Sequence, residues 1–286
     1  METEEIEKIK DYWEDSLCGA HFVKDEKLTK TFFENYTAFR YQKEHHLLDI
    51  VDWKSAKGKD VLEIGLGIGA DSVRWGRYAK TYTGIDLTHE AAKTTNAHFE
   101  IMGLTGNIIQ GNAERLPFND NSFDIVYSHG VLHHTENIEN TFEQISRVLR
   151  PNGKFIIMLY TKDSFNYWIR IQLYFRLRFF LELIKSKLGL KNNQTWSEHI
   201  ANFKQMGWKY ISWSEFPHHC TDGPNCTTAY IYYKKEIVDK LAKHGLEVNS
   251  SCKTHFPVWG GKRLVKLETA LAKRLGFFRF YFGTKV

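Results

Sequence analysis

The sequence has few of the features that place a protein in a membrane or outside the cell. Its 286 residues include four cysteines, Cys18, Cys220, Cys226 and Cys252, without a C-x-x-C pair or the density of a disulfide framework. We therefore expect reduced thiols. The N-terminal residues lack the basic segment and apolar run of a secretory signal, which predicts a cytoplasmic location.

Long uninterrupted apolar runs are also missing. The longest aromatic and aliphatic segment, residues 165–184, is interrupted by Arg170, Arg176, Arg178 and Glu182. Charged side chains at these positions exclude an ordinary transmembrane helix.

A strong excess of one charge is missing as well. The formal net charge is +5, and the stretch 162–191 alone holds seven basic and two acidic residues. A nucleic-acid-binding protein typically has a broader basic face with recognisable motifs, and none of the standard motifs occurs here. We expect no nucleic-acid partner, whereas a peripheral membrane contact stays open.

From residue 59 onward, short apolar runs alternate with helical patterns, which is typical of strand-helix units in a parallel sheet. Strands are predicted at residues 61–64, 82–86, 107–110, 123–128, 154–160 and 246–250. Helices are predicted at residues 70–79, 90–102, 137–149 and 234–244. The tail, residues 277–285, alternates like a last strand inserted antiparallel. The sequence thus predicts an α/β, doubly wound fold.

The first strand leads into a glycine-rich turn that is compatible with two cofactors. The stretch Gly65–Ala70 fits the dinucleotide pattern G-x-G-x-x-G/A, whereas the stretch Glu63–Gly69 fits the adenosyl-binding pattern E/D-x-G-x-G-x-G. Asp86 ends the second predicted strand, where a carboxylate can accept hydrogen bonds from both ribose hydroxyls. An acidic residue at this place suits NAD and S-adenosylmethionine equally.

Four further motifs follow at the spacing of the third, fourth and fifth strands. They are Gly111–Phe118 (GNAERLPF), Asn121–Ser128 (NSFDIVYS), Val131–His134 (VLHH) and Arg147–Lys154 (RVLRPNGK). In this order they resemble class I S-adenosylmethionine-dependent methyltransferases, especially the small-molecule branch with the ubiquinone and menaquinone biosynthesis enzymes. The resemblance covers residues 58–160. It implies a seven-stranded, mostly parallel sheet of order 3-2-1-4-5-7-6 with strand 7 antiparallel, and S-adenosylmethionine as the cofactor.

The resemblance also implies roles around the methionine part of the cofactor. The backbone at Gly65, Gly67 and Gly69 would approach it closely, because glycine has no side chain. Glu63 would orient this loop. Arg40 would pair with the methionine carboxylate, or else lie on the surface of an amphipathic helix.

Roles around the nucleoside follow in the same way. Asp86 would bind the ribose, and Leu87 would pack on the adenine. Asn112 stands where the family commonly has an acidic residue that accepts from the adenine amino group, and its amide carbonyl can accept the same bond, next to the Ala113 N–H on the ring. His129 completes the expected cofactor residues.

Methyl transfer from a sulfonium is a direct displacement, so the protein mainly aligns the reacting atoms and excludes water. A general base helps when the acceptor carries a proton at neutral pH. His133, after the fourth strand at the carboxyl edge of the sheet, is the candidate base, with a packing or capping role as the alternative. The same loop lacks the Asn/Asp-Pro-Pro-aromatic motif by which nucleic-acid amino methyltransferases resemble one another. Its absence argues against that class of enzyme.

Four regions are expected along the chain. They are an N-terminal helical cap (1–57), the cofactor-binding core (58–160), an aromatic and basic lid insertion for the acceptor (161–233) and the C-terminal completion of the sheet (234–286). The cationic residues of the helical part, residues 164–188, fall on two separate sides, which favours a packed lid over a membrane-surface helix.

The stretch His218–Cys226 (HHCTDGPNC) is predicted to form a turn-rich loop. Its side chains are able to ligate a metal, to bind a thiophilic acceptor such as an arsenical, or to contact a polar acceptor. Its spacing matches none of the common zinc patterns, so we predict no metal. We expect His218, His219 and Asp222 to line the acceptor pocket.

Together these observations predict an S-adenosylmethionine-dependent methyltransferase of a small molecule, and the aromatic lid suggests an apolar or planar acceptor. The acceptor atom and the oligomeric state stay open. So do three alternative functions: an NAD(P)-dependent oxidoreductase, a non-catalytic adenosyl-binding protein, and a methyltransferase of a lipidic or quinone acceptor at a membrane surface.

Overall fold

A seven-stranded sheet of order β3-β2-β1-β4-β5-β7-β6 forms the centre of the computed structural model, which describes residues 3–15, 17, 19–256 and 264–286. The strands are β1 Asp60–Ile64, β2 Thr81–Asp86, β3 Asn107–Gln110, β4 Phe123–His129, β5 Leu149–Tyr160, β6 Leu246–Thr254 and β7 Phe278–Lys285. Strand β7 runs antiparallel to both β5 and β6, and β1 to β5 are parallel. The predicted fold class and strand order are confirmed.

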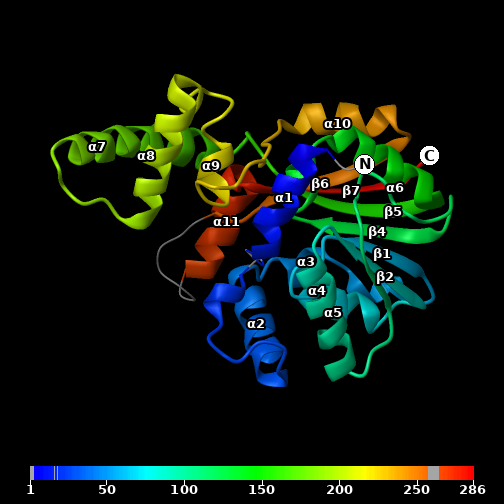
Figure 1. Ribbon diagram of the computed structural model, residues 1–286. Coiled ribbons are helices and arrows are strands. Elements are labelled where there is room, and N and C mark those ends of the chain that lie inside the picture. The colour runs from blue at the N-terminus through cyan, green and yellow to red at the C-terminus, as the bar shows by residue number, and fades with distance from the viewer. Residues whose placement is uncertain (1–2, 16, 18, 257–263) are drawn as a thin grey trace.

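Helices cover both faces of this sheet (Figure 1). They are α1 Glu4–Asp15, α2 Lys30–Lys43, α3 Leu47–Ile50, α4 Ala70–Gly76, α5 His89–Ile101, α6 Ile138–Val148, α7 Arg176–Lys187, α8 Gln194–Met206, α9 His218–Thr221, α10 Lys234–Lys243 and α11 Val265–Leu275. One core joins α2, α4 and α5 to one face, and a second core joins α6 and α10 to the other. Alternate residues of β1 enter the two cores, as the period of a strand requires: Val61 enters the first and Leu62 the second.

Side-chain caps begin the helices that follow the strand ends. The Thr88 hydroxyl accepts from Ala91 N at the start of α5, and the Asn137 side chain accepts from Glu139 N at the start of α6. Short polar side chains stabilise a helix start because they satisfy N–H groups that have no partner within the helix. These caps bring each chain segment back over the sheet directly after the strand.

The region after β5 departs from the sequence expectations in detail. The predicted helical part, residues 164–188, is a π-helical segment, Asn166–Phe175, followed by α7. The predicted turn-rich loop begins with one short helix, α9, which Pro217 starts with a φ of −57°. Helix α11 was not predicted. Strand β5 begins at Leu149, because Leu149 pairs with Phe123 before a register shift.

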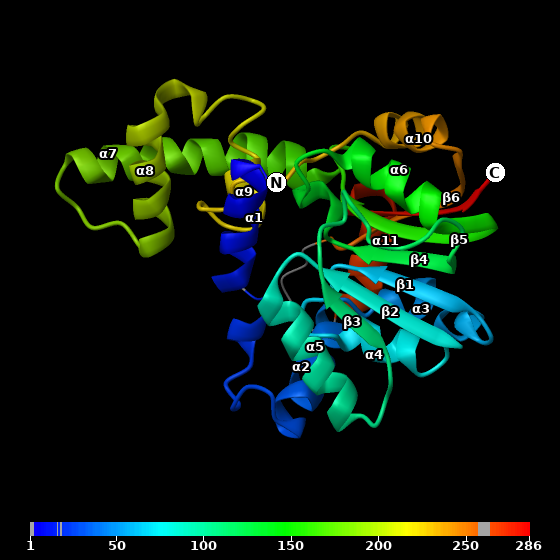
Figure 2. The same ribbon diagram turned by 45° about the vertical axis from the view of Figure 1, so that its right-hand side comes forward.

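The insertion extends to one side of the sheet. Figures 1 and 2 show α7 and α8 side by side, away from the strands, while α1 lies between this unit and α5. Within the described part of the chain, no helix is both long and apolar enough to cross a membrane.

Glycine at position 283 is required by the packing of β7 between its two neighbours. A Cβ added there would lie 2.1 Å from the Glu247 carbonyl oxygen and 2.3 Å from the Phe155 ring. We expect Gly283→Ala to lower the free energy of unfolding by about 1–3 kcal/mol, because the added methyl group overpacks a sheet interior. Urea denaturation measures this loss. Thr284→Ala, one residue further on the same strand, is the control, and an equal loss in both variants would contradict the steric explanation.

Candidate cofactor and acceptor site

A cavity of about 430 Å³ opens at the carboxyl ends of the parallel strands. The ends of β1, β2, β4 and β5 contribute to its wall, together with α1, α2 and the insertion. Ligands of open α/β sheets bind at this edge, where the strand order reverses, and here the reversal falls between β1 and β4. The volume lies within the range of small-molecule sites.

The glycine-rich turn forms the floor of this cavity between β1 and α4. Gly65 has a φ of +82°, and a Cβ at this position would lie 2.0 Å from Cγ2 of Val131 in the loop after β4. Glycine is therefore required at position 65 for the loops after β1 and β4 to approach each other. Gly67 also lines the cavity, whereas Gly69 begins α4 just behind the wall.

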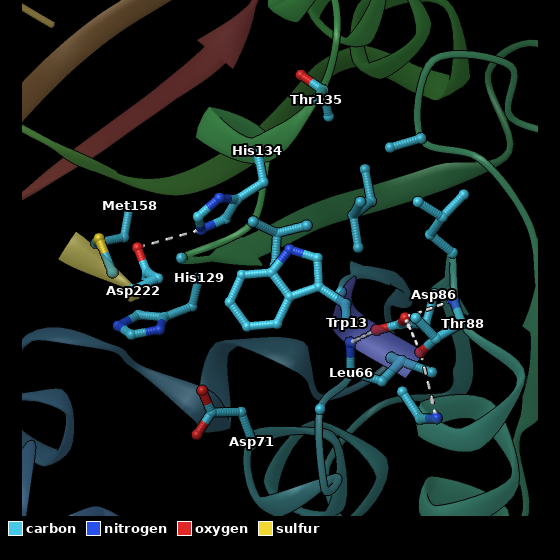
Figure 3. A pocket seen from close by; sticks show the side chains of 18 of the residues that line it. Trp13, Leu66, Asp71, Asp86, Thr88, His129, His134, Thr135, Met158 and Asp222 are labelled. Atoms are coloured by element: carbon cyan, nitrogen blue, oxygen red, sulfur yellow. Dashed lines mark hydrogen bonds and ion pairs between the residues drawn. The ribbon is translucent and has the colours of Figure 1, made fainter. Parts of the chain in front are cut away.

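Asp86 lies at the end of β2 with its carboxylate beside the turn (Figure 3). One oxygen accepts from Leu66 N at 2.7 Å, and the other accepts from the Thr88 backbone N–H at 2.9 Å and the Thr88 hydroxyl at 2.7 Å. A carboxylate offers about four acceptor positions. The three protein donors fix the orientation of Asp86 and leave capacity for a ligand hydroxyl.

The predicted adenine residues line the next part of the wall. Leu87, Asn112 and Ala113 all face the cavity. The Asn112 side-chain oxygen accepts from Glu114 N at 2.8 Å, so this side chain is held by its own loop. One lone pair of that oxygen remains for a donor in the cavity. The predicted adenine contact of Asn112 stays a prediction.

A buried ion network borders the opposite side of the cavity. Arg40 of α2 binds both oxygens of Asp71, at 3.2 Å from Nε and 2.7 Å from Nη2. Its Nη1 lies 3.3 Å from Glu44, and its Nη2 lies 3.2 Å from His129 Nδ1. Four of the five guanidinium N–H groups thus have protein partners. The predicted pairing of Arg40 with a ligand carboxylate stays a prediction, with a single N–H left for it.

The network determines the charge of this wall. The guanidinium always donates, so His129 Nδ1 accepts and the ring is neutral in this arrangement, with Nε2 3.1 Å from Glu44. Burial works to raise the pKa values of Glu44 and Asp71, but the Arg40 charge outweighs it and holds both below their usual range. One cation therefore faces two carboxylates. The wall carries an excess of negative charge and favours a cationic ligand group.

Glu63 lines the same wall but differs from its neighbours in protonation. Burial and the nearby Asp71 charge raise the pKa of Glu63 to about 8. Its carboxyl group accepts from the Tyr82 hydroxyl at 2.6 Å. Glu63 is thus a largely neutral group beside the turn at pH 7, and the predicted loop-orienting role is not tested by this contact.

The structure places His134, and not His133, in the cavity wall. The ring of His133 is fully buried against Tyr160, with centroids 3.9 Å apart, and burial lowers its pKa well below the usual value. Neither of its ring nitrogens has a hydrogen-bond partner among the described residues. This is the packing arrangement named above as the alternative. A direct catalytic role of His133 gains no support from its position.

His134 is oriented by the chain on both sides. Its Nδ1 lies at hydrogen-bond distance from the Thr228 carbonyl, so Nδ1 carries a hydrogen and Nε2 carries the lone pair of the neutral ring. Nε2 lies 3.9 Å from Asp222, and Asp222 accepts from the Tyr160 hydroxyl at 3.0 Å. Figure 3 shows this pair facing the cavity.

Of the residues predicted for the acceptor from the HHCTDGPNC stretch, Asp222 lines the cavity, and His218 and His219 do not. The His219 ring stacks on Tyr210, and its Nδ1 lies 3.0 Å from the Pro224 carbonyl. Burial lowers the pKa of His218 to about 4. Both histidines make contacts within the insertion, since Ala229 N also donates to His218 Nδ1, and their predicted acceptor contacts remain untested.

Cysteines of the insertion lie close to the site. Cys220 lines the cavity, and Cys226 lies with His134 and Asp222 so that their ligand atoms are within 4.8 Å of one another. Burial raises the pKa of Cys226 to about 12, so the thiol is protonated at neutral pH. Cys18 lies outside the described residues.

The N-terminal helix lines the cavity through Ile6, Ile9 and Trp13. Trp13 lies between Asp86 and His134 in Figure 3, with its ring centroid 4.8 Å from that of His134. Tyr12 donates to the Asp222 carbonyl, and Glu14 accepts from the first N–H groups of α5. Helix α1 thus bridges the insertion and the nucleoside side of the cavity.

Sequence reasoning missed several wall residues, of which Asp71, Glu44 and His134 matter most. Glu44 has a weak signal, because it follows Arg40 by four residues on a helical pattern. His134 had none that separates it from His133, since the two are adjacent and only the short helical turn 132–134 decides which ring faces the cavity.

We expect Arg40→Met to lower the free energy of unfolding at pH 7 by about 3–5 kcal/mol, because it leaves buried carboxylates without a cation. The pKa values of Glu44 and Asp71 are lower in the folded state, so their stabilising effect is complete above about pH 5 and is lost as the pH falls. The difference between wild type and variant should therefore shrink at pH 3. Urea denaturation at both pH values measures it. The exposed Lys43→Met is the control, and a pH-independent loss in Arg40→Met would contradict the ionic explanation.

Comparison with known proteins agrees with this geometry. Residues 62–157 match the family described as a methyltransferase domain. An uncharacterised methyltransferase, YcgJ of Bacillus subtilis, is 31% identical over 99 residues, which are 34% of this chain and 39% of the relative. A sterol 4-C-methyltransferase of Caenorhabditis elegans is 32% identical over 98 residues, 34% of this chain and 29% of the relative. The match therefore spans well under half of the length of these relatives.

The fold extends beyond the matched segment. The structure of geranyl diphosphate C-methyltransferase from Streptomyces coelicolor, in complex with Mg²⁺, geranyl diphosphate and S-adenosyl-L-homocysteine, has a TM-score of 0.59 and 12% identity, with all of both chains covered. At this identity the likeness concerns the fold alone. Residues 62–157 thus match a methyltransferase domain, and the whole chain has the fold of class I methyltransferases.

Proposed function

We propose that this protein is an S-adenosylmethionine-dependent methyltransferase of a small-molecule acceptor. The observation that carries the proposal is Asp86, which three protein donors orient beside the Gly65 turn with capacity left for a ligand hydroxyl, within a segment that matches a methyltransferase domain. Two further features fit the cofactor. The contact between Gly65 and Val131 leaves no room for a side chain at the turn, and the wall of Asp71 and Glu44 suits a cationic ligand.

When bound, the cofactor supplies an electrophilic methyl group on a sulfonium. The residues of this chain then have three tasks: Asp86 holds the ribose, the backbone at Gly65 and Gly67 receives the methionine part, and α1 with Trp13 keeps water from the reacting atoms. An orienting role of this kind suits direct displacement, which needs no covalent enzyme intermediate.

The remaining wall, between His134, Tyr160 and Asp222, is our proposed acceptor site. The lone pair of His134 Nε2 is available to take a proton from a hydroxyl acceptor, and Asp222 at 3.9 Å stabilises the imidazolium that forms. The Tyr160 hydroxyl holds Asp222 in place. The sterol enzyme among the similar proteins supports a lipidic acceptor.

The cofactor is tested by thermal unfolding with S-adenosylmethionine, S-adenosylhomocysteine and NAD(P) in parallel. We expect both adenosyl ligands to stabilise the protein, by about 2.7 kcal/mol at a hundred times Kd, and NAD(P) to leave it unchanged. Asp86→Asn should weaken adenosyl binding about tenfold or more, because a charged acceptor is lost. The exposed Asp239→Asn is the control. Stabilisation by NAD(P) alone would instead indicate the oxidoreductase.

The acceptor site is tested by comparing the two adjacent histidines. With hydroxyl acceptors that give a methylated product by mass, His134→Asn should lower kcat by about 10²–10⁴-fold at neutral pH. The loss should diminish at higher pH, where the acceptor ionises without a base. His133→Phe should keep activity, since it preserves the ring packing and removes no described hydrogen bond. Equal losses in both variants would show that His134 acts only through packing.

A further inference from the structure

Helix α7 is apolar on two opposite faces, and only one of them is covered. Phe175, Phe179 and Leu183 recur every four residues and pack with Trp196 and Ile200 of α8. This inner face holds the insertion together. Because α8 covers only this side, the opposite side of α7 has no cover from the described chain.

The outer face carries a continuous stripe of exposed aliphatic side chains. Leu177, Leu181, Ile184 and Leu188 follow one another at helical spacing and are 59%, 60%, 55% and 71% exposed. Isolated exposed leucines are normal on protein surfaces, but a contiguous apolar stripe marks an interaction site.

The stripe continues toward the body of the protein into an aromatic end. Ile169 and Leu173 extend it at the same spacing through the π-helical segment, and both are exposed. Trp168 and Trp213 are also exposed and lie with ring centroids 6.4 Å apart. Exposed tryptophans beside aliphatic side chains are typical of surfaces that meet the interface of a lipid bilayer, where one end of the ring is apolar and the other wet.

Basic residues border this stripe on both sides. Arg178 and Lys185 share one edge of α7, and Lys187 lies on the other, where Arg176 donates to the backbone carbonyls of Ile211 and Ser212. The one acidic residue of the helix, Glu182, is buried and paired with Arg178 at 3.0 Å and Lys185 at 2.8 Å. In the sequence, basic residues on two sides of this segment favoured a packed lid. In the structure, these two sides border a single exposed stripe. Long cationic side chains at such borders reach past apolar surface toward charged groups.

We propose that the outer face of α7 docks on the surface of an anionic lipid bilayer. Apolar side chains enter the boundary between headgroups and acyl chains, and the bordering cations bind lipid phosphates. A second copy of the chain fits this face less well. In a two-fold dimer the stripe would meet itself, and the basic borders of the two copies would face each other without acidic partners.

The docking surface is continuous with the wall of the cavity. Asn166 and Arg170, at the start of the π-helical segment, line the cavity, while Ile169 and Leu173 of the same segment belong to the stripe. Figures 1 and 2 both show the α7 and α8 unit extending from the edge of the protein where α1 and α9 meet. Docking through α7 therefore holds this edge close to the lipid.

The test is co-sedimentation of the full chain with vesicles of phosphatidylcholine alone or mixed with phosphatidylglycerol. We expect binding to the mixed vesicles that falls as salt is added. Leu177→Glu with Leu181→Glu should weaken this binding about tenfold or more, because it removes apolar burial. Lys187→Gln should weaken it about fivefold. Leu48→Glu, at a leucine of α3 that is 46% exposed, is the matched control and should bind like wild type.

Thermal unfolding with and without S-adenosylmethionine separates docking from folding and from the proposed function. Each variant should unfold like wild type and keep its response to the cofactor, since none of these residues lines the cavity. The proposal is overturned if wild type stays in the supernatant with mixed vesicles, or if Leu48→Glu loses binding as strongly as the stripe variant. The proposal is also overturned if sedimentation equilibrium without lipid shows a dimer that Leu177→Glu with Leu181→Glu dissociates.

Discussion

The buried carboxylate of Asp71 is the interaction on which the arrangement of the site depends. It accepts from Arg40 and Tyr41 of α2, and from the Tyr127 hydroxyl of β4, while its own backbone belongs to α4. A charge removed from water must be compensated by partners at correct distances, or it destabilises the fold. Because Asp71 and its partners together come from three separate elements, the compensation is possible in only one relative placement of α2, α4 and β4. This placement positions the cavity wall and brings the N-terminal region against the core.

One part of the cavity wall is formed by the ends of the sheet strands, and the other part by segments outside the sheet. The ends of β1 and β2 provide the glycine turn and Asp86, in the arrangement common to open α/β sheets. The acceptor side depends on α1 and the insertion, which meet through Tyr12, Asp222 and Thr228. The proposed acceptor site is therefore built mainly from segments outside the sheet. That division agrees with the comparisons, since the matched residues 62–157 cover the cofactor side and leave out most of the acceptor side.

The insertion has two surfaces with different physical tasks. Its interior, around Phe179 and Tyr210, is a separate apolar core that makes α7 and α8 a stable unit beside the sheet. Histidines that read as candidate ligands in the sequence, such as His219, take part in this packing. The outer face of α7 adds nothing to that core. Keeping large aliphatic side chains there, between cations, costs solubility without stabilising the fold, and this is why we interpret it as a binding surface.

The strand order was implied by the resemblance to class I methyltransferases, whereas the sequence alone determined the alternation of strands and helices, the glycine turn and the place of Asp86 at a strand end. Each of these depends on local patterns, namely the alternation of strand and helix, a glycine spacing and the residue at a strand end. Tertiary structure decided which histidine of the pair 133–134 faces the cavity, because a short helical turn sets the direction of adjacent side chains and leaves no trace in composition. It also decided that Arg40 binds Asp71, a partner 31 residues away. Contacts between distant segments follow from packing and from the compensation of buried charge, and these are properties of the folded chain as a whole.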